Sequence, residues 1–162
     1  VEVLIPDFCG RTELLAKVTL SGPDVLAHNV ETIRRLTRKV RDPRAGYDQS
    51  LAVLSHIKDI DPNMLTKSSI MVGVGETEEE VKETMIDLRK AHVDFLTLGQ
   101  YLQPTKRHLK VADFIHPDVF EEYRRFGEEI GFKYVASGPL VRSSYRAGEF
   151  FIRDYINKSR AS

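Results

Sequence analysis

Polar residues that could do chemistry occur directly after several short runs of apolar, β-branched residues. They fall in five places: Asp7, residues 28–31, residues 73–76, residues 99–101 and residues 142–145. If these runs are parallel strands, their carboxyl ends lie at one edge of a sheet, where α/β proteins bind their ligands. The sequence therefore predicts a polar binding site built from these five segments.

The segment Gly73-Val74-Gly75-Glu76-Thr77 offers two backbone positions without side-chain bulk. A planar ligand or a phosphate can approach such a chain closely. The segment lacks the third glycine of a dinucleotide fingerprint and the lysine of a P-loop, so neither motif is present. A tight turn that enters a capped helix explains the same residues, because Thr77 and Glu80 have the spacing of a capping box.

Two further segments also allow both a functional and a structural interpretation. His28, Asn29 and Glu31 could hydrogen-bond a ribose or an amino-acid group, whereas Asn is also common in turns. Ser143 and Ser144 precede an expected helix, where serine commonly serves as the N-cap. Residue type alone does not decide between these roles.

A cluster of basic residues and a single cysteine are the remaining candidates. The basic cluster comprises Arg34, Arg35, Arg38, Lys39, Arg41 and Arg44. It could dock an acidic partner protein, or it could be the solvated face of a helix. Cys9 lies beside a glycine turn without a nearby His or second Cys, which favours a buried or incidental thiol over a nucleophile.

Composition excludes several classes of protein. The 162 residues include 24 basic and 24 acidic side chains, so the net charge is +0, unlike the basic excess of nucleic-acid-binding domains. No apolar stretch approaches the roughly 18 residues that span a bilayer. One cysteine allows no internal disulfide and no multi-cysteine metal site, and a reducing, intracellular compartment is expected.

The elements that must position these residues alternate between strands and helices. Strands are expected at residues 1–8, 25–30, 66–74, 93–102 and 133–136. Helices are expected at residues 11–20, 31–40, 49–60, from Thr77 onward, 117–131 and about 145–157. This alternation predicts an α/β fold with a parallel sheet. Five strands are too few for a closed eight-stranded barrel, so a partial barrel is predicted, with residues 1–137 as the barrel portion and 138–162 as a C-terminal extension.

The strand-end segments together resemble one family, lipoyl synthase, of the radical S-adenosylmethionine enzymes. The resemblance rests on residues 1–8, 27–32, 66–77, 96–104 and 138–145, which occur in family order and span nearly the whole chain. The most specific of these is Arg142-Ser143-Ser144-Tyr145, because the family is marked by an Arg-Ser-Ser-Tyr ending. The resemblance implies a partial (β/α)6 barrel whose C-terminal half this chain represents.

The resemblance also implies an activity, cofactors and partners. Lipoyl synthase inserts two sulfur atoms into an octanoyl chain held on a lysine of a lipoyl carrier protein, such as the glycine cleavage H protein or the E2 lipoyl domains. It uses S-adenosylmethionine and two 4Fe-4S clusters. The expected location is the mitochondrial matrix, by similarity to eukaryotic members. Neither nucleic acid nor a membrane is an expected partner.

Residue roles follow by match to the family's motifs. Asn29 and Glu31 match a strand end that contacts the ribose or methionine part of the cofactor. Gly73, Gly75 and Glu76 match the glycine-rich turn near the adenine, and Gln100 and Tyr101 the next strand end. Ser144 matches an oxygen ligand of the auxiliary cluster; a serine oxygen is a harder ligand than thiolate, which would leave one iron easier to release.

Two departures from the family limit what this chain is expected to do alone. Cys9 stands where the family usually has Arg. The family's six cluster-binding cysteines lie upstream of the matched region, and the chain begins inside an apolar run without a Met, which indicates a piece of a longer protein. The 162 residues by themselves are therefore expected to be inactive. The alternative is a non-catalytic barrel fragment that acts as a protein-binding module.

Overall fold

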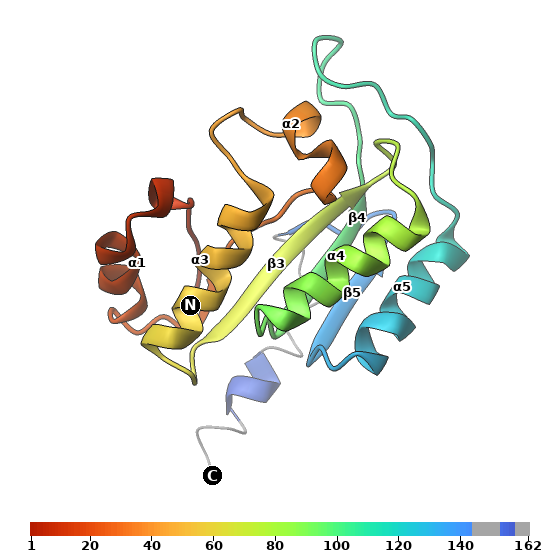
Figure 1. Ribbon diagram of the computed structural model, residues 1–162. Coiled ribbons are helices and arrows are strands. Elements are labelled where there is room, and N and C mark those ends of the chain that lie inside the picture. The colour runs from red at the N-terminus through yellow and green to blue at the C-terminus, as the bar shows by residue number, and fades with distance from the viewer. Residues whose placement is uncertain (144–152, 158–162) are drawn as a thin grey trace.

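The computed structural model describes residues 1–143 and 153–157, and it consists of one parallel sheet with helices along it (Figure 1). The strands are β1 (Glu2–Leu4), β2 (Val25–Ala27), β3 (Leu65–Val72), β4 (Phe95–Gln100) and β5 (Tyr134–Gly138). The helices are α1 (Thr12–Thr19), α2 (Thr37–Val40), α3 (Tyr47–Ile60), α4 (Glu78–Lys90) and α5 (Pro117–Glu129), with 3-10 turns η1 (Phe8–Gly10) and η2 (Arg34–Leu36).

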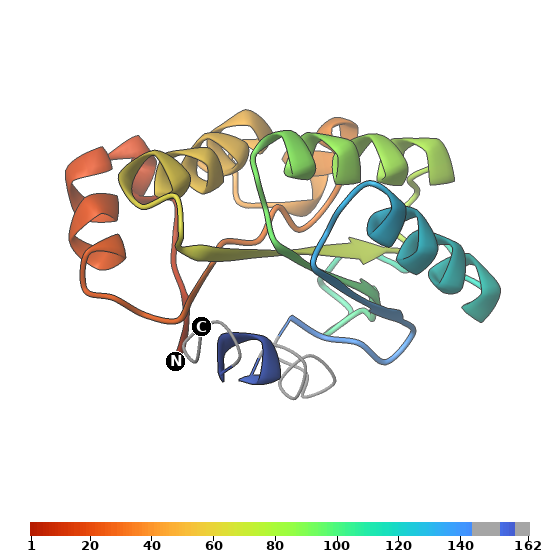
Figure 2. The same cartoon turned by 90° about the horizontal axis from the view of Figure 1, so that it is seen from below.

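The strands pair in sequence order, β1-β2-β3-β4-β5, and every pairing is parallel. Helices α1 to α5 lie along one side of the sheet, while the short helical stretch 153–157 lies on the other side (Figure 2). A doubly wound sheet would instead reverse its strand order and carry helices on both faces. The predicted α/β fold is thus confirmed, and its arrangement is that of the wall of a partial barrel.

The two faces of the sheet differ in chemistry because side chains alternate along each strand. Ile70, Val72, Leu96 and Leu98 are fully buried on the face that α4 and α5 cover, in one core with Met85, Leu88 and Phe120. Each such side chain contributes roughly 2 kcal/mol through burial. The opposite face carries Lys67, Ser69 and Thr97, all buried polar residues. A second, smaller core under α1 and α3 is formed by Ile5, Leu15, Leu26, Val53, Ile57 and Met64.

Helix α4 begins where the sequence predicts. The Thr77 hydroxyl accepts a hydrogen bond from the Glu80 amide (3.3 Å), and the Glu80 carboxylate accepts one from the Thr77 amide (2.9 Å), so the capping box is present. The expected inward residues Val81, Met85 and Leu88 are all buried. Pro117 occupies the first turn of α5, again as predicted.

Three sequence-predicted elements are wrong in extent, and one of them is the strand expected at residues 25–30, which ends at Ala27. The first strand ends at Leu4 rather than at residue 8, because Pro6 has no amide to donate and Asp7 caps the turn η1. The predicted helix 31–40 is instead a backbone bridge, the turn η2 and the four-residue helix α2. Val30, Thr32 and Ile33 are buried, and this tertiary burial outweighs their helical spacing. Of the expected helix 145–157, residues 153–157 are helical and the remainder lies outside the described residues.

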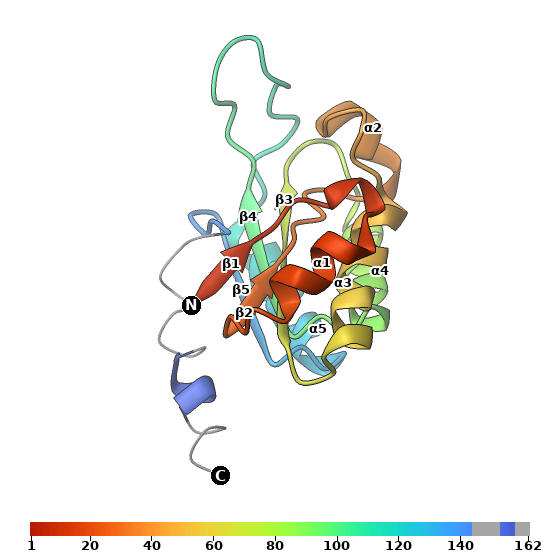
Figure 3. The ribbon, with the colours of Figure 1, turned by 90° about the vertical axis from the view of Figure 1, so that its left-hand side faces the viewer.

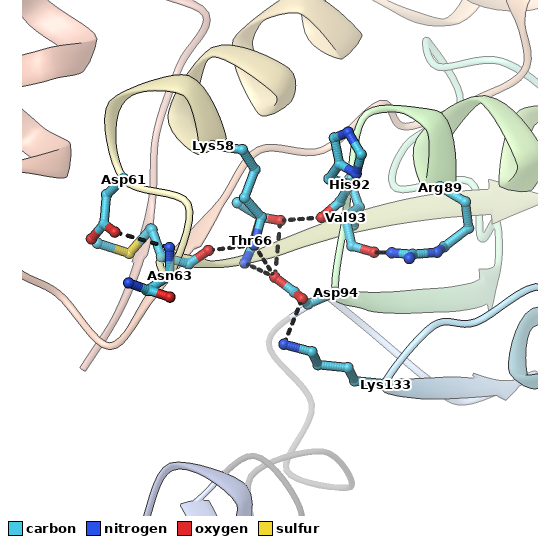
Figure 4. A network of polar contacts seen from close by, with 10 residues as sticks. Lys58, Asp61, Asn63, Thr66, Arg89, His92, Val93, Asp94 and Lys133 are labelled. Atoms are coloured by element: carbon cyan, nitrogen blue, oxygen red, sulfur yellow. Dashed lines mark hydrogen bonds and ion pairs between the residues drawn. The ribbon is translucent and has the colours of Figure 1, made fainter. Parts of the chain in front are cut away.

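The amino-end edge of the sheet is held by a buried carboxylate (Figure 4). Asp94 lies just before β4, and its side chain is 7% exposed. It accepts hydrogen bonds from Lys58 Nζ (2.6 Å), Lys133 Nζ (2.9 Å) and the Thr66 amide (2.9 Å). Burial raises the pKa of Asp94, but the lysines and the amide outweigh burial, so the pKa lies below its ordinary value. The network joins α3, β3, β4 and β5 at one point.

Candidate functional site

A cleft of about 410 Å³ opens at the carboxyl ends of β1 and β2. Asp7, His28, Asn29 and Glu31 line it together with the loop that contains Arg41. The first four residues are expected at this edge from the sequence. Arg41 was expected only as part of a basic cluster.

His28 has a structural role in the wall of this cleft. Its Nδ1 lies 2.9 Å from the Ile5 carbonyl oxygen, which can only accept, so this nitrogen carries the proton. Nε2 then accepts from the Ser50 hydroxyl (2.9 Å), and the same Oγ accepts from Arg41 (2.8 Å). Burial lowers the pKa of His28, and the Arg41 charge adds to this effect. The neutral imidazole thus holds Ser50, and through it Arg41, at the cleft.

Asn29 and Glu31 are the residues best placed to bind a ligand. Both are partly buried and line the cleft, and neither side chain has a hydrogen-bond partner within the described residues. Glu31 has a φ of 67°, a conformation uncommon for a residue with a side chain. Two hydrogen bonds to β3 fix its backbone. The Glu31 amide donates to the Ser69 carbonyl (3.0 Å), and the Met71 amide donates to the Glu31 carbonyl (2.8 Å). An amide and a carboxylate held in this way suit hydroxyl or ammonium groups.

The glycine-rich turn is filled by the protein itself on one side. The Glu76 carboxylate accepts hydrogen bonds from the Gly73 amide and from the Val74 amide (2.9 Å), so an acidic side chain occupies the position where a phosphate would bind. A Cβ on Gly73 would lie 2.2 Å from Gln100 Nε2 and 2.5 Å from the Asp113 carbonyl oxygen. At Gly75 the nearest atom would be the Ala112 Cβ, 3.9 Å away. Packing therefore requires a glycine at position 73, whereas a side chain at position 75 would make only ordinary van der Waals contact.

Gln100 and Tyr101 have polar groups that are already engaged. Gln100 Nε2 donates to the Tyr101 and Asp113 carbonyl oxygens (3.0 Å each), and its Oε1 accepts from the Ile115 amide (2.9 Å). The Tyr101 hydroxyl donates to the Leu109 carbonyl (2.8 Å). Both side chains are buried and hold the long segment that follows β4. The sequence shows no local sign of this role.

Residues 1–88 match the Radical SAM superfamily, which is more than half of the chain. The chain belongs to the radical SAM superfamily. It is 62% identical over 160 residues to "Lipoyl synthase, mitochondrial" of Branchiostoma floridae, covering 99% of this chain and 43% of that protein. It is 60% identical to "Lipoyl synthase, chloroplastic" of Sorghum bicolor (99% and 44%) and 58% identical to "Lipoyl synthase, mitochondrial" of Bos taurus (99% and 43%). The chain thus spans less than half the length of these relatives.

This radical SAM chain fits one implied cofactor and not the other. The free side chains of Asn29 and Glu31 in the cleft fit the polar groups of S-adenosylmethionine. An iron–sulfur cluster held by three thiolates does not fit, because the sequence has one cysteine. Within residues 1–143 and 153–157, no group of three or more His, Cys, Asp or Glu could hold a metal ion. Ser144, the expected metal ligand, lies outside the described residues.

Cys9 and most of the basic cluster lie at the surface, as an incidental thiol and a solvated face would. Cys9 is exposed, so it is not a buried thiol. Arg34 pairs with Asp48 (2.6 Å) and lies over the Tyr47 ring. Arg35 binds both oxygens of Glu80 (2.6 and 2.8 Å) and donates to the Gly75 carbonyl (2.9 Å), which links η2 to the glycine-rich turn. Arg44 pairs with Asp42 (2.8 Å), so three of the six cluster residues form ion pairs. Arg41 donates to the Ser50 hydroxyl, and Arg38 and Lys39 are exposed and form no ion pair within the described residues.

The residues before Ser144 are fixed against the polar face of the sheet. A Cβ on Gly99 would lie 2.1 Å from the Val141 carbonyl oxygen, so only glycine allows this approach to β4. Lys67 donates to both Glu2 carboxylate oxygens (2.8 and 2.9 Å) and to the Ser143 carbonyl (2.7 Å). The Arg142 guanidinium donates to the Val141 carbonyl (2.8 Å). We call residues 139–143 the strap.

No helix in the described part of the chain is long and apolar enough to cross a membrane.

Proposed function

We propose that the protein carrying this chain is a lipoyl synthase. It would use S-adenosylmethionine to insert two sulfur atoms into the octanoyl chain on a lysine of lipoyl carrier proteins. The observation that carries the proposal is 58–62% identity to lipoyl synthases across 99% of the chain. The cleft with Asn29 and Glu31 at the strand ends supports it, because radical SAM membership calls for a cofactor site at this edge.

The residues of this chain would divide into two groups in that function. S-adenosylmethionine, when bound, supplies the radical chemistry. Asn29 and Glu31 would bind its ribose or methionine groups, and Gly75 would leave space for the adenine. Four residues would shape the site without a direct polar contact to the cofactor: Gly73, Glu76, Gln100 and Tyr101. Other parts of the protein already bond their polar groups or, at Gly73, fill the space beside the residue. Ser144 would be a metal ligand at the end of the strap.

We further propose the mitochondrial matrix as the location, and the glycine cleavage H protein and E2 lipoyl domains as carriers. The names of the Branchiostoma and Bos relatives, both mitochondrial, support the location. The chloroplastic name of the Sorghum relative shows that similar sequences also serve a second organelle.

The test of the cofactor site compares three variants of the intact protein. Asn29→Ala and Glu31→Gln should each weaken S-adenosylmethionine binding about tenfold, measured by equilibrium dialysis, because each removes one hydrogen bond to a charged or polar group. Arg38→Ala is the matched surface control and should bind normally. Mass spectrometry of an octanoylated carrier then checks for two added sulfur atoms. A carrier that gains no sulfur with the wild-type protein would reject the proposed function.

The alternative, a non-catalytic protein-binding module, is favoured by the single cysteine. Iron, sulfide and reductant added to the isolated 162 residues should give no stable 4Fe-4S absorbance. Stable absorbance would contradict the expectation that these residues alone are inactive.

In the intact protein, Ser144→Ala should weaken sulfur insertion while cofactor cleavage persists; unchanged insertion would leave the serine as a helix cap only.

A further inference from the structure

The segment between β4 and α5, residues 102–116, projects beyond the carboxyl edge of the sheet as a long loop (Figures 1 and 3). Its tip carries Lys106, Arg107 and Lys110, all exposed. None of these three forms an ion pair within the described residues, unlike the arginines near η2. The segment's one acidic residue is Asp113. We call residues 102–116 the basic loop.

The base of the basic loop is fixed rather than free. The Ala112 amide donates to the Gly73 carbonyl (2.9 Å), and Gln100 holds the Asp113 carbonyl and the Ile115 amide. Leu109, Val111 and Ile115 are partly buried against the main core. The loop is therefore anchored on the same glycine-rich turn and strand end that border the proposed cofactor site.

The tip of the loop is also ordered by its own hydrogen bonds. Thr105 Oγ1 lies 2.8 Å from His108 Nδ1, and the His108 amide donates to the Thr105 carbonyl (3.0 Å). Gln103 Nε2 donates to the His108 carbonyl (2.8 Å). These bonds order the backbone that carries Lys106 and Arg107, so less backbone entropy is lost when a partner binds.

Apolar side chains flank the cations. Phe114 is 76% exposed and Leu102 is 49% exposed, and both belong to the basic loop. An exposed aromatic and an aliphatic side chain beside unpaired cations are typical of a protein interface, where apolar anchors lie within a charged rim. A nucleic-acid site is less favoured, since the chain as a whole has a net charge of +0.

We propose that the basic loop is the docking surface for an acidic face of the carrier protein whose lysine holds the octanoyl chain. The inference rests on the proposed function. A substrate attached to a protein must reach the cleft from the carboxyl edge of the sheet, and the loop projects from that edge. In the basic cluster near η2, which the sequence suggested for this role, half of the six cations are paired with Asp48, Glu80 and Asp42, whereas none of the three cations of the basic loop is paired within the described residues.

The test measures association of the intact protein with an octanoylated carrier domain of net negative charge, over a range of salt concentrations. The variant Lys106→Glu/Arg107→Glu/Lys110→Glu should lower the association rate constant about tenfold or more at low salt, because charges at an interface rim act mainly on encounter. The difference should shrink as salt screens the charges. Arg38→Glu/Lys39→Glu, two exposed cations outside the loop, is the matched control and should change the rate constant less than about twofold.

S-adenosylmethionine binding by the triple variant shows whether its fold is intact, and normal binding is expected. Carrier association that is unchanged in the folded triple variant, or lowered equally in the control, would overturn the docking proposal while leaving the proposed function in place. The docking proposal would also be overturned if the wild-type protein bound an RNA duplex and the triple variant lost that binding while its carrier association stayed unchanged. If wild-type protein neither binds the carrier nor adds sulfur to it, both proposals fail.

Discussion

Residues of the same type in the candidate site can have different roles, which the sequence alone does not distinguish. Gly73 and Gly75 lie two positions apart, and both have a positive φ, 95° and 107°. The missing side chain of Gly73 makes room for Gln100 and the Asp113 carbonyl, whereas a Cβ at Gly75 would meet only the Ala112 Cβ, at 3.9 Å. One glycine is thus required by packing, and the other is not.

Substitution of these two glycines should separate the roles. Gly73→Ala and Gly75→Ala each place a side chain in a left-handed conformation, at a cost of about 1 kcal/mol. Gly73→Ala should cost a further 1–3 kcal/mol or so, because its Cβ displaces Gln100 and the base of the basic loop. Urea unfolding gives the free energies, and hydrogen exchange at residues 109–115 should rise only in Gly73→Ala. Equal effects in the two variants would contradict the packing role.

His28 gives a pH dependence at the same scale. Burial holds its pKa below the usual value, so the unfolded chain binds a proton at a higher pH than the folded chain does. Folding stability should therefore be complete above the unfolded pKa of about 6.5 and fall as the pH drops through the lowered native pKa. His28→Gln removes this contribution. Unfolding free energies measured from pH 8 to pH 5 should fall more steeply for the wild-type protein than for the variant.

At the scale of elements, helix α4 owes its start to local chemistry. Its N-cap, acidic first turn and basic last turn all agree with the direction of the helix dipole. Glu80 also binds Arg35, which donates to the Gly75 carbonyl, so the start of α4 holds the glycine-rich turn as well. A substitution at the N-cap of α4 should therefore also affect the glycine-rich turn.

Thr77→Ala should destabilise the protein by about 1 kcal/mol, because the Glu80 amide loses its acceptor. Thr77→Ser keeps the hydroxyl and is the control; it should cost only a few tenths of that amount. Chemical denaturation measures both. A Thr77→Ser variant as unstable as Thr77→Ala would assign the effect to the lost methyl group instead of the cap.

Elements with local signals were predictable, and contacts between distant segments were not. The capping box at Thr77 and Pro117 at a helix start identified α4 and α5 closely. Residues 31–40 have helical spacing, yet burial of Ile33 and the bridge from Glu31 to β3 decide their conformation. The strand ends placed Asn29 and Glu31 correctly at the cleft edge. The engagement of Gln100 with Asp113 and Ile115 depends on a loop that no local pattern encodes.

For the whole molecule, the two edges and two faces of the sheet have separate tasks. The carboxyl edge carries the cleft and the basic loop, and the amino edge carries the Asp94 network. The apolar face packs on helices, and the polar face holds the strap. Stabilising contacts and candidate binding groups are therefore largely separated in space.

Asp94→Asn should destabilise the protein by about 3 kcal/mol at pH 7, because Lys58 and Lys133 lose their common carboxylate in a mostly buried position. The Asp94 pKa is lowered in the folded state, so its contribution is complete above the unfolded pKa of about 4 and is lost as the pH falls through the native pKa. The wild-type and variant unfolding free energies should converge on acidification. A difference that stays constant to pH 2 would contradict this account.

Gly99→Ala should loosen the strap, because its Cβ would lie 2.1 Å from the Val141 carbonyl oxygen, a backbone atom that cannot rotate away. Hydrogen exchange at residues 141–143 should increase while α4 keeps its protection. Gly138→Ala is the matched control, since its Cβ would meet only the Val141 Cγ2 at 3.4 Å. Equal exchange in the two variants would show that the approach at Gly99 does not hold the strap.

The Lys67 contacts also bear on how the chain reaches this structure. Lys67 is 65 residues from Glu2 and 76 from Ser143, so each contact closes a long loop whose entropy must be lost first. Contacts of this kind form late, after local helices and neighbouring strands have collapsed. We therefore expect Lys67 to act mainly after the folding barrier has been crossed, so that its interactions slow unfolding more than they speed folding.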